Sequence, residues 1–554
     1  MKKYLILDCY VDEPACLGVP PFISPYPRYI YGALMCAGVN PGSISYLTID
    51  SMREQNFTFT ENYDQVFLTG GAVVPGKYLG AKIGTLAEIN RIIRQNRKTP
   101  IAVGGLINRA VERDTGNVTV LKNDIEKYAF TLAAGEPADM QRTTEEIAQW
   151  SSAGAEVVKK HPWFPDIICE IETGRGCPRE KHCSFCSEGL IDKIEFRRSR
   201  EVLDEIDSLL KYGVTRFRIG RQPDIIQFGS RLKEFRNGFP QPEPSEVIEL
   251  FSELKKRKDS GAIHVLNVDN ANPGSIVNWP EHSARILEII AAAVTPGDTL
   301  PFGVESFDLN VVKQNSLKVT PEEAVMAIRI VNDICGGRIN GIPALLPGIN
   351  LIHGLKGETM DTFRINYEYL ARIAEEGLLV KRINIRKLHP YPDTPIYSEK
   401  LKISNGMTKR FEYYRDKIRD DIDNLMLRQV YPAGTILREN FILETRDGYS
   451  MGKQISSYSI TVKMPGELKL RTFQDAIITG HRERSLSTLP VPFNINTAPA
   501  KSFELIPGIG RERASTIVLK RPFETREALR DFLDNTPPQL AEAIIKNSRV
   551  ETAQ

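Results

Sequence analysis

The chain reads ETGRGCPREKHCSFC over residues 172–186, a glycine-rich lead-in followed by three cysteines within ten residues. The segment follows a predicted strand at 167–172, so the cysteines stand on one loop where a strand ends. Their spacing is C-x5-C-x2-C, at Cys177, Cys183 and Cys186. Thiolates this close suit an iron–sulfur cluster or zinc. Three thiolates on a four-iron cluster leave one iron open to a chelating ligand. A structural zinc site needs a fourth ligand, for which His182 is a candidate, and three buried cysteines without a ligand are the third alternative.

Beyond this loop, strands and helices alternate to about residue 400. The expected strands are 167–172, 216–219, 264–268, 300–304, 345–352 and 382–388, and the expected helices are 201–211, 245–258, 282–293, 321–334 and 360–376. About six βα units favour a partial or complete barrel over an open sheet.

Before the loop, residues 1–140 alternate in the same way. Strands at 4–11, 45–50, 65–69, 101–103 and 129–134, with a helix at 79–97, predict a Rossmann-like parallel sheet with helices on both faces. Three of these strands end in glycine-bearing loops: Thr69-Gly70-Gly71, Gly104-Gly105 and Gly135-Glu136-Pro137. Ligands of such sheets bind at the carboxyl ends of the strands, where glycine lets a large flat molecule come close. Any one of these glycines could serve only a tight turn, but three loops in register favour a ligand.

The remaining sequence suggests further modules. Residues 141–165 read as a helix and linker, 166–400 as the barrel, and 401–430 as a helical connector. Short strands with glycine turns over 431–490, at 435–445, 452–464 and 475–479, predict a small β-barrel. Residues 491–554 contain Ile506-Pro507-Gly508-Ile509-Gly510, which resembles the hairpin of a helix-hairpin-helix domain.

Composition excludes several classes of protein. Of the 554 residues 41% are hydrophobic and 26% charged, which excludes a disordered chain, a collagen and a coiled-coil rod. The net charge of +2 gives no general field that draws the chain to nucleic acid or a membrane. Eight cysteines are too few for a disulfide scaffold. No apolar run approaches 20 residues and Asp8 interrupts the N-terminal run, so we expect a cytoplasmic protein with no membrane partner.

The lead-in, the three cysteines and Phe185 before the last of them resemble the radical S-adenosylmethionine (SAM) enzymes, whose usual spacing is C-x3-C-x2-C. The resemblance spans roughly residues 165–400. It implies that the cysteines hold a [4Fe-4S] cluster whose open iron chelates SAM, and that one electron then yields a 5′-deoxyadenosyl radical. It also implies SAM contacts from Phe185, Gly220, Glu305, Ser306 and Gly354. For Glu305 the alternative is a structural salt bridge.

The N-terminal domain resembles the cobalamin-binding domain of cobalamin-dependent radical SAM enzymes. This resemblance implies that the three glycine-bearing loops contact the corrin, through Thr69, Gly70, Gly71, Gly104, Gly105, Gly135, Glu136 and Pro137. No histidine precedes His161, so this domain has none to offer the cobalt. The two implied cofactors would carry out different steps. The radical removes hydrogen from an unactivated carbon, methylcobalamin delivers a methyl group to that carbon, and a second SAM remethylates the cobalamin.

Archaeal radical SAM proteins with a terminal hairpin resemble most of the chain. That resemblance implies a C-methyltransferase for post-translational modification of a protein in a methanogen, served by an electron-donor protein. The implied substrate is methyl-coenzyme M reductase, at Cα of a glutamine. An alternative is a tRNA-modifying methylthiotransferase with a second cluster on Cys9, Cys16 and Cys36 and RNA bound by the C-terminal modules. A non-catalytic binding protein is the third hypothesis. Residues 500–554 carry nine Lys and Arg against eight Asp and Glu, net +1, so both a protein and a nucleic-acid contact of the hairpin stay open.

Overall fold

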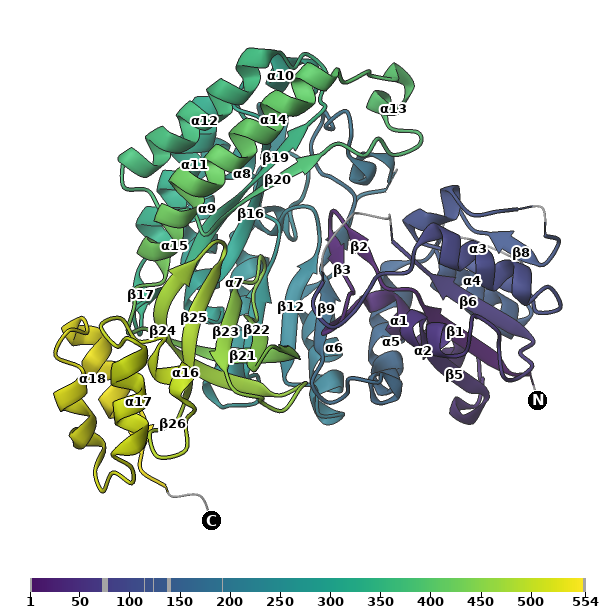
Figure 1. Cartoon of the computed structure of the whole chain (residues 1–554). Coiled ribbons are helices and arrows are strands. Elements are labelled where there is room, and N and C mark those ends of the chain that lie inside the picture. The colour runs from purple at the N-terminus through teal and green to yellow at the C-terminus, as the bar shows by residue number, and fades with distance from the viewer. Residues whose placement is uncertain are drawn as a thin grey trace. The chain divides into compact units, whose positions relative to one another are not determined.

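The computed structural model describes residues 2–71, 78–113, 115–122, 124–136, 141–191 and 193–551 (Figure 1). The chain forms two compact units, Met1–Ala293 with His389–Lys400, and Val294–Leu388 with Leu401–Gln554. Within the described residues, each helix is too short or too polar to cross a lipid bilayer.

The first unit begins with a five-stranded parallel sheet in the order β5-β1-β6-β7-β8. Its strands are β1 (Tyr4–Asp8), β5 (Ile44–Thr48), β6 (Gln65–Thr69), β7 (Ile101–Gly104) and β8 (Val118–Val120). β1 and β6 are buried along their whole length, as in a sheet covered on both faces. Because the strand order reverses between β1 and β6, the ligand crevice of such a sheet lies where these two strands end. The predicted parallel α/β sheet is confirmed.

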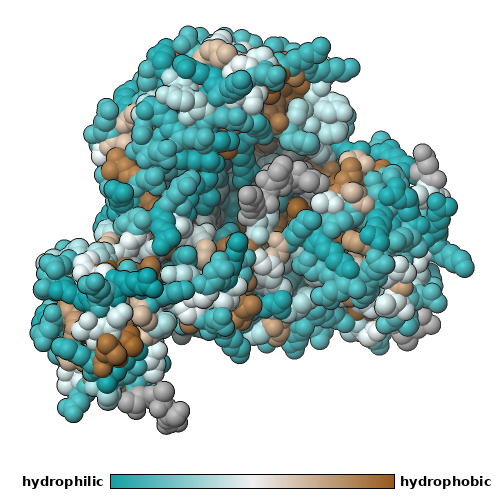
Figure 2. Space-filling model, viewed as in Figure 1, coloured by the Kyte–Doolittle hydropathy of each residue, from teal (hydrophilic) through white to brown (hydrophobic). Residues whose placement is uncertain are grey.

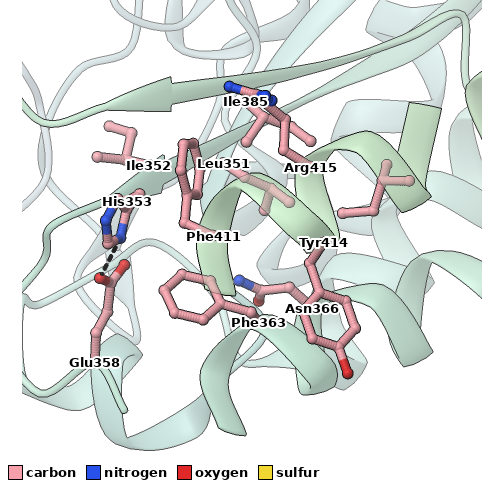
Figure 3. Close-up of a pocket in the computed structure, with 11 residues that line it drawn as sticks. Leu351, Ile352, His353, Glu358, Phe363, Asn366, Ile385, Phe411, Tyr414 and Arg415 are labelled. Atoms are coloured by element: carbon pink, nitrogen blue, oxygen red, sulfur yellow. Dashed lines mark hydrogen bonds and ion pairs between the residues drawn. The ribbon is translucent and has the colours of Figure 1, made fainter. Parts of the chain in front are cut away.

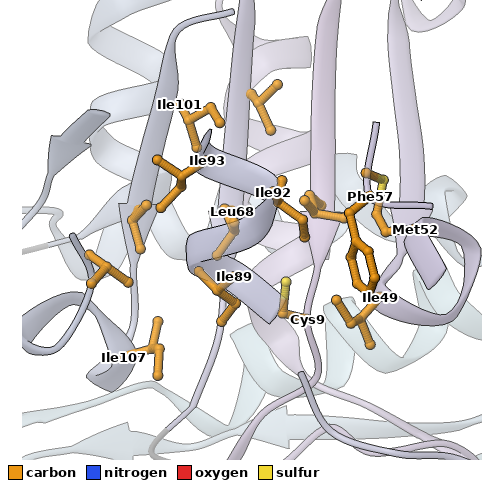
Figure 4. Close-up of a cluster of buried hydrophobic side chains, with 14 of the residues drawn as sticks. Cys9, Ile49, Met52, Phe57, Leu68, Ile89, Ile92, Ile93, Ile101 and Ile107 are labelled. Atoms are coloured by element: carbon orange, nitrogen blue, oxygen red, sulfur yellow. The ribbon is translucent and has the colours of Figure 1, made fainter. Parts of the chain in front are cut away.

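Helices cover both faces of this sheet. α2 (Ile49–Glu54) and α3 (Leu86–Gln95) bury Met52, Ile89 and Ile92 against one face (Figure 4). α1 (Pro25–Cys36) and α4 (Ile125–Ala134) bury Ile30 and Ile125 against the other face. A capping box between Thr85 and Glu88 fixes the start of α3.

The predicted strand at 129–134 is wrong, because these residues form the second half of α4. A short apolar run has no period that separates a buried strand from a buried helix. Gly135 caps this helix in the left-handed conformation, at φ 72°. Ile125 packs against Gly104 at the end of β7, so Gly135 lies about 15 Å away along the helix, far from the carboxyl edge of the sheet. The Gly135-Glu136 loop is therefore not a strand-end loop, and Pro137 lies outside the described residues.

A second parallel sheet of the first unit has the order β15-β12-β9-β4. β9 (Ile168–Glu172), β12 (Arg216–Arg221) and β15 (Val265–Val268) are three of the predicted barrel strands. β4 (Phe22–Ile23) comes from the N-terminal segment, so residues before position 140 complete the sheet of the barrel region. The helices of this region are α6 (Ser199–Lys211), α7 (Pro244–Asp259), α8 (Pro273–Asn278) and α9 (Pro280–Ala293).

The second unit holds the other three predicted barrel strands in a parallel sheet of order β16-β19-β20. They are β16 (Asp298–Glu305), β19 (Leu345–His353) and β20 (Arg382–Lys387). Its helices are α10 (Leu309–Gln314), α11 (Pro321–Cys335), α12 (Met360–Glu375), α14 (Asn405–Ile418) and α15 (Asn424–Val430). All six predicted strands are confirmed, whereas their closure into one barrel and the predicted domain limits stay predictions.

The predicted small β-barrel is present as a closed barrel of order β21-β22-β23-β25-β24. Its strands are β21 (Ile436–Arg446), β22 (Tyr449–Gln454), β23 (Thr461–Pro465), β24 (Phe473–Arg482) and β25 (Ser485–Val491). α16 (Ala500–Phe503), α17 (Arg511–Leu519) and α18 (Pro538–Lys546) follow and share a core with the barrel. The identity of these helices as a helix-hairpin-helix domain stays a prediction.

The loop between β22 and β23 fastens the small barrel to the sheet of the second unit. Tyr458 donates a hydrogen bond from its hydroxyl to Asn350 Oδ1 in the middle of β19 (2.6 Å). Gly348 makes room for the Tyr458 ring, since a Cβ there would lie 2.7 Å from it. The Ser457 amide donates to Asp298 Oδ1 (3.1 Å). This end of the small barrel therefore packs against the sheet of the same unit.

Shorter elements complete the fold. They are β2 (Asp12–Glu13), β3 (Cys16–Leu17), α5 (Thr144–Ala153), β10 (Gly174–Arg175), β11 (Glu195–Phe196), β13 (Phe235–Arg236), β14 (Phe239–Pro240), β17 (Arg338–Ile339), β18 (Ile342–Pro343), α13 (Pro395–Glu399), β26 (Phe493–Asn494) and β27 (Ser548–Arg549).

Candidate active site

A short antiparallel pair closes the base of the cysteine loop. β10 pairs with β11, so Arg175 and Glu195, at the two ends of the cysteine loop, lie side by side. Gly174 permits this pairing, because a Cβ there would lie 2.5 Å from the carbonyl oxygen of Glu195. Gly176 has φ +80°, which suits glycine. The glycine-rich lead-in therefore shapes the loop itself.

The three cysteines lie on this loop, and a turn joins the last two of them. Cys183 is buried, Cys177 and Cys186 are half-buried, and none of the chain's eight cysteines, all of them described, forms a disulfide. The Cys186 amide donates to the carbonyl of Cys183 (3.2 Å), and Arg179 donates to Cys183 Sγ (3.3 Å).

The donor set suits an iron–sulfur cluster. Each of three thiolates on one loop can bind a different iron of a four-iron cube, and no other side chain is needed. His182, the candidate fourth ligand of a zinc site, holds its Nε2 3.1 Å from the carbonyl of Cys177. Over the described part of the chain, no group of three or more His, Cys, Asp and Glu side chains is arranged to hold a metal ion.

Buried ion pairs join the cysteine loop to the carboxyl edge of the N-terminal sheet. Arg175, at the base of the loop, pairs with Asp124 at the start of α4. Arg142 pairs with Glu126 of α4 (2.9 Å) and with Glu172 at the end of β9. Burial raises the pKa of Glu126 to about 7, although Arg142 opposes the shift. The carboxyl edges of the two sheets of the first unit therefore adjoin.

The β2–β3 hairpin makes a second connection between these edges. Glu13 accepts hydrogen bonds from the Leu106 amide (3.3 Å) and the Tyr26 hydroxyl (3.2 Å). Burial raises the pKa of Glu13, and the charge of Arg221 lowers it. Arg221, at the end of β12, also pairs with Glu188 beyond the last cysteine (3.4 Å). Charged groups from both sheets thus converge on the cysteine loop.

Residues 389–400, here named the returning segment, form a third connection within the first unit. The Tyr391 hydroxyl donates to the carbonyl of Leu106 (2.8 Å), in the loop after β7, and burial raises the pKa of Tyr391 to about 12. Asp393 pairs with Arg109 of the same loop. The Ile396 amide donates to the carbonyl of Ser184, between two cysteines (3.0 Å). One short segment therefore contacts both loops that the sequence assigns to cofactors.

The glycines predicted to contact cobalamin have structural explanations. A Cβ added at Gly71 would lie 2.7 Å from the Asp12 amide, and one added at Gly104 would lie 2.6 Å from the Ile125 side chain. A Cβ at Gly105 would lie 2.5 Å from the Gly70 carbonyl oxygen, and one at Gly70 would lie 3.0 Å from the Ile107 side chain. These loops need glycine for their own packing. Thr69 differs, because its buried hydroxyl, at the end of β6, has no hydrogen-bond partner among the described residues. This unsatisfied hydroxyl marks the crevice where the strand order reverses.

Two of the residues predicted to contact SAM lie in the first unit. Phe185 is half-buried between Cys183 and Cys186. Gly220 leaves room for the buried ion pair between Glu170 and Arg218, since a Cβ there would lie 2.4 Å from Glu170 Oε1. The other three lie in the second unit.

Glu305 has the strongest functional features of those three. It ends β16 with φ +66°, at a shift in register against β19. Its side chain is buried, and Oε2 has no hydrogen-bond partner in the described chain. Burial raises the pKa of Glu305 to about 7, while Lys318 and Arg386 lower it. A positive φ and a buried oxygen without a hydrogen bond are features that ligand-binding residues often have, while the charges of Lys318 and Arg386 keep the structural alternative open.

Ser306 and Gly354 lie near strand ends but serve the fold. The Ser306 hydroxyl accepts from the Asp308 amide (3.1 Å) and lies 3.4 Å from Asn366 Oδ1. Gly354 has φ +103°, and its amide donates to Glu358 (2.8 Å). The predicted roles of these residues in cofactor binding stay predictions.

Comparison with known proteins gives the relatives of the chain. No family model matches it. A protein of Methanocaldococcus jannaschii, "Uncharacterized protein MJ0274", is 38% identical over 512 residues, which are 88% of this chain and 92% of the relative. An uncharacterized protein of Archaeoglobus fulgidus is 35% identical over 531 residues, 94% of this chain and 95% of the relative.

The chain belongs to this archaeal family.

Solved structures with some likeness to this member of the archaeal family include two enzymes. The radical SAM methyltransferase TsrM from Kitasatospora setae, solved with tryptophan and a SAM analogue, has a TM-score of 0.48 and 16% identity over 72% of this chain and 76% of its own. Another TsrM structure carries cobalamin and a [4Fe-4S] cluster. The cobalamin-dependent radical SAM enzyme OxsB has a TM-score of 0.48 and 14% identity over 76% of this chain and 55% of its own. With TM-scores below 0.5, these structures assign no activity to the archaeal family.

Sequence reasoning missed a buried histidine in the archaeal protein. His353, at the end of β19, holds Nδ1 2.8 Å from Glu358 Oε2 and stacks on Phe411 with ring centres 4.4 Å apart (Figure 3). Both side chains line a small pocket with Phe363. Only the spacing of His353 and Glu358 around a glycine turn could have indicated the pair.

Proposed function

We propose that this protein is a cobalamin-dependent radical SAM methyltransferase. The observation that carries the proposal is the ion pair between Arg175 of the cysteine loop and Asp124 at the carboxyl edge of the N-terminal sheet. It supports a cluster on the loop and a flat ligand at the strand-order reversal facing one shared space.

Cys177, Cys183 and Cys186 would hold the [4Fe-4S] cluster, and the edge around Thr69 would hold cobalamin. Bound together with SAM, these groups supply hydrogen-atom removal from a carbon and delivery of a methyl group to it. The chain's own residues prepare the site. In the first unit, Arg179 donates a hydrogen bond to Cys183 Sγ and so holds this side chain in place. In the second unit, Glu305 offers a buried acceptor to hydroxyl or ammonium donors. The β2–β3 hairpin and the returning segment contact these loops and would help to exclude water from the bound groups.

We further propose a protein as the substrate, with Cα of a glutamine in methyl-coenzyme M reductase of a methanogen as the specific candidate and an electron-donor protein as a second partner. The nearly balanced charge of residues 500–554 gives nucleic acid no electrostatic advantage over a protein as the partner of these helices. The contact of Tyr458 with β19 supports the same choice, because it withdraws one end of the small barrel from RNA.

A methylthiotransferase is not proposed, because its second cluster would need Cys9, Cys16 and Cys36 together. Cys9 follows β1 at the carboxyl edge of the sheet, while Cys36 ends α1, shortly before β5 begins at the amino edge. The two cysteines therefore lie at opposite edges.

Anaerobic reconstitution of the whole chain with iron, sulfide and hydroxocobalamin tests the proposal. We expect bound cobalamin by visible absorption, about four irons per chain and 5′-deoxyadenosine from SAM under reducing conditions. Cys183→Ala should lose both the iron and the SAM cleavage, whereas Cys36→Ala, at the exposed end of α1, should keep both. Unchanged iron content in the Cys183→Ala variant would contradict the assignment of the cluster to these cysteines. Absence of cobalamin from the wild-type protein would contradict cobalamin as the methyl donor.

A further inference from the structure

A polar row crosses the sheet of the first unit. Glu170 of β9, Arg218 of β12 and Asn267 of β15 are neighbours in the strand register, so their side chains share one face. The alternate residues Ile171, Phe217 and Ile219 are apolar and face the other side. Branched apolar side chains normally fill the inner layers of βα barrels, so a row of polar side chains here is a departure.

Two members of the row are paired with each other. Arg218 donates from Nη1 to both carboxylate oxygens of Glu170 (2.6 Å each), and its other terminal nitrogen pairs with Asp269. The absence of a side chain at Gly220 leaves room for this arrangement. Two carboxyl groups around one guanidinium give the row an excess of hydrogen-bond acceptors.

Asn267 is the exception in this row. Its side chain is completely buried, and neither Nδ2 nor Oδ1 has a hydrogen-bond partner in the part of the chain that the structure describes. Among the described residues, no other buried carboxamide has both of its atoms unsatisfied. Gln222, two residues beyond Gly220, accepts from Thr173 and donates to the carbonyls of Ile219 and Asp269. A buried donor and a buried acceptor that both lack partners destabilise a fold, and a bound ligand that pairs with both would remove this cost.

We propose that Asn267 binds a planar amide group of the substrate, either a side-chain carboxamide or a peptide unit. This inference rests on the proposed function and adds the chemistry of the substrate. An amide presents one acceptor and one donor side by side, and so satisfies both Nδ2 and Oδ1. A carboxylate would leave Oδ1 unsatisfied and would face Glu170 and Asp269, while an ammonium group would leave Nδ2 unsatisfied. Asn267 lies on the same sheet as β9, which leads into the cysteine loop.

A stability comparison tests whether Asn267 has a structural partner. Asn267→Leu replaces the carboxamide by an apolar group of similar size, so the melting temperature should stay equal or rise. The matched control is Asn96→Leu, because buried Asn96 donates to the carbonyls of Phe57 and Ile92 and accepts from the Phe59 amide. This control should melt at a lower temperature. An equal fall in both variants would overturn the inference.

Binding of small probes tests the chemistry of the ligand. In saturation-transfer NMR on the SAM-bound, reconstituted protein, we expect a signal for propionamide with the wild type, none for methyl propionate, and loss of the propionamide signal in Asn267→Leu. A crystal soaked in propionamide should show it at Asn267. Equal binding of amide and ester, an unchanged signal in the variant, or an ordered water alone at Asn267 would overturn the inference. Iron content and SAM cleavage of the wild type report separately on the proposed function.

Discussion

Glu305 shows how much one residue can indicate about a site. Its positive φ, its burial and an Oε2 atom without a hydrogen bond to any described residue coincide at the end of β16. Such a combination destabilises the fold, so we expect the residue to be retained for binding.

The raised pKa of Glu305 predicts a pH dependence of stability. The folded protein holds the proton up to about pH 7, whereas the unfolded chain releases it near pH 4.5. Stability should therefore fall as the pH rises from about 4.5 to 7, by on the order of 3 kcal/mol at most. Glu305→Gln should make this fall smaller by the contribution of Glu305, while other buried carboxyls such as Glu126, whose pKa is also about 7, keep theirs. Denaturant unfolding at a series of pH values measures the difference.

Glu368→Gln is the control for that series, because Glu368 is an exposed residue of α12. It should keep the wild-type pH dependence. A Glu305→Gln protein whose stability follows that of the wild type at every pH would show that Glu305 titrates normally.

Gly104 gives a second prediction for a single residue. A Cβ there would lie 2.6 Å from Ile125, so Gly104→Ala should lower the free energy of unfolding by about 1–3 kcal/mol in the absence of any cobalamin. Gly337→Ala, with no atom within 4 Å of the new Cβ, should change it little. Chemical denaturation of the cobalamin-free proteins measures both. An effect of Gly104→Ala confined to the cobalamin-bound protein would favour the corrin contact instead.

The spacing of the cysteines pointed to them as metal ligands, and the resemblance to radical SAM enzymes pointed to Glu305; the roles of both stay predictions. Asn267 could not be found in this way. An asparagine inside a buried strand looks like any polar interruption, and only the register against Arg218 and the missing partners distinguish it.

At the scale of elements, the returning segment is the feature with the clearest consequence. Tyr391→Phe removes its hydrogen bond to Leu106 and should destabilise the local structure by about 1 kcal/mol. Faster amide hydrogen exchange at residues 106–109 and at Ile396 is the expected readout. Tyr397→Phe, on the same segment but half exposed, should leave exchange unchanged. Equal exchange in Tyr391→Phe and wild type would show that the segment contributes nothing to either loop.

Prediction of elements succeeded where a buried run had flanking turns. All six barrel-region strands and the closed small barrel were expected. It failed at 129–134, where the run is too short for its period to be read. It also missed β4 and the β2–β3 hairpin, because two-residue strands depend on distant partners that carry no local signal.

At the scale of the whole molecule, charge is the property that bears on partners. The face in Figure 2 is mostly hydrophilic with scattered hydrophobic residues, and the net charge over 554 residues is only +2. We therefore expect no binding of bulk tRNA at about 10 µM in 150 mM salt, measured by filter retention. Saturable binding in the submicromolar range at this salt concentration would reopen the tRNA alternative.

The path of the chain between its two units carries a consequence for how the protein is made and divided. The polypeptide leaves the first unit after residue 293, returns for residues 389–400 and leaves again. During synthesis, Ile396, whose amide bonds to the Ser184 carbonyl, therefore emerges from the ribosome only after the strands β16, β19 and β20 of the second unit. For the same reason no single cut separates the units: a gene split at residue 293 gives an N-terminal half without the piece that joins its two loops, and complementation by the other half has to supply it.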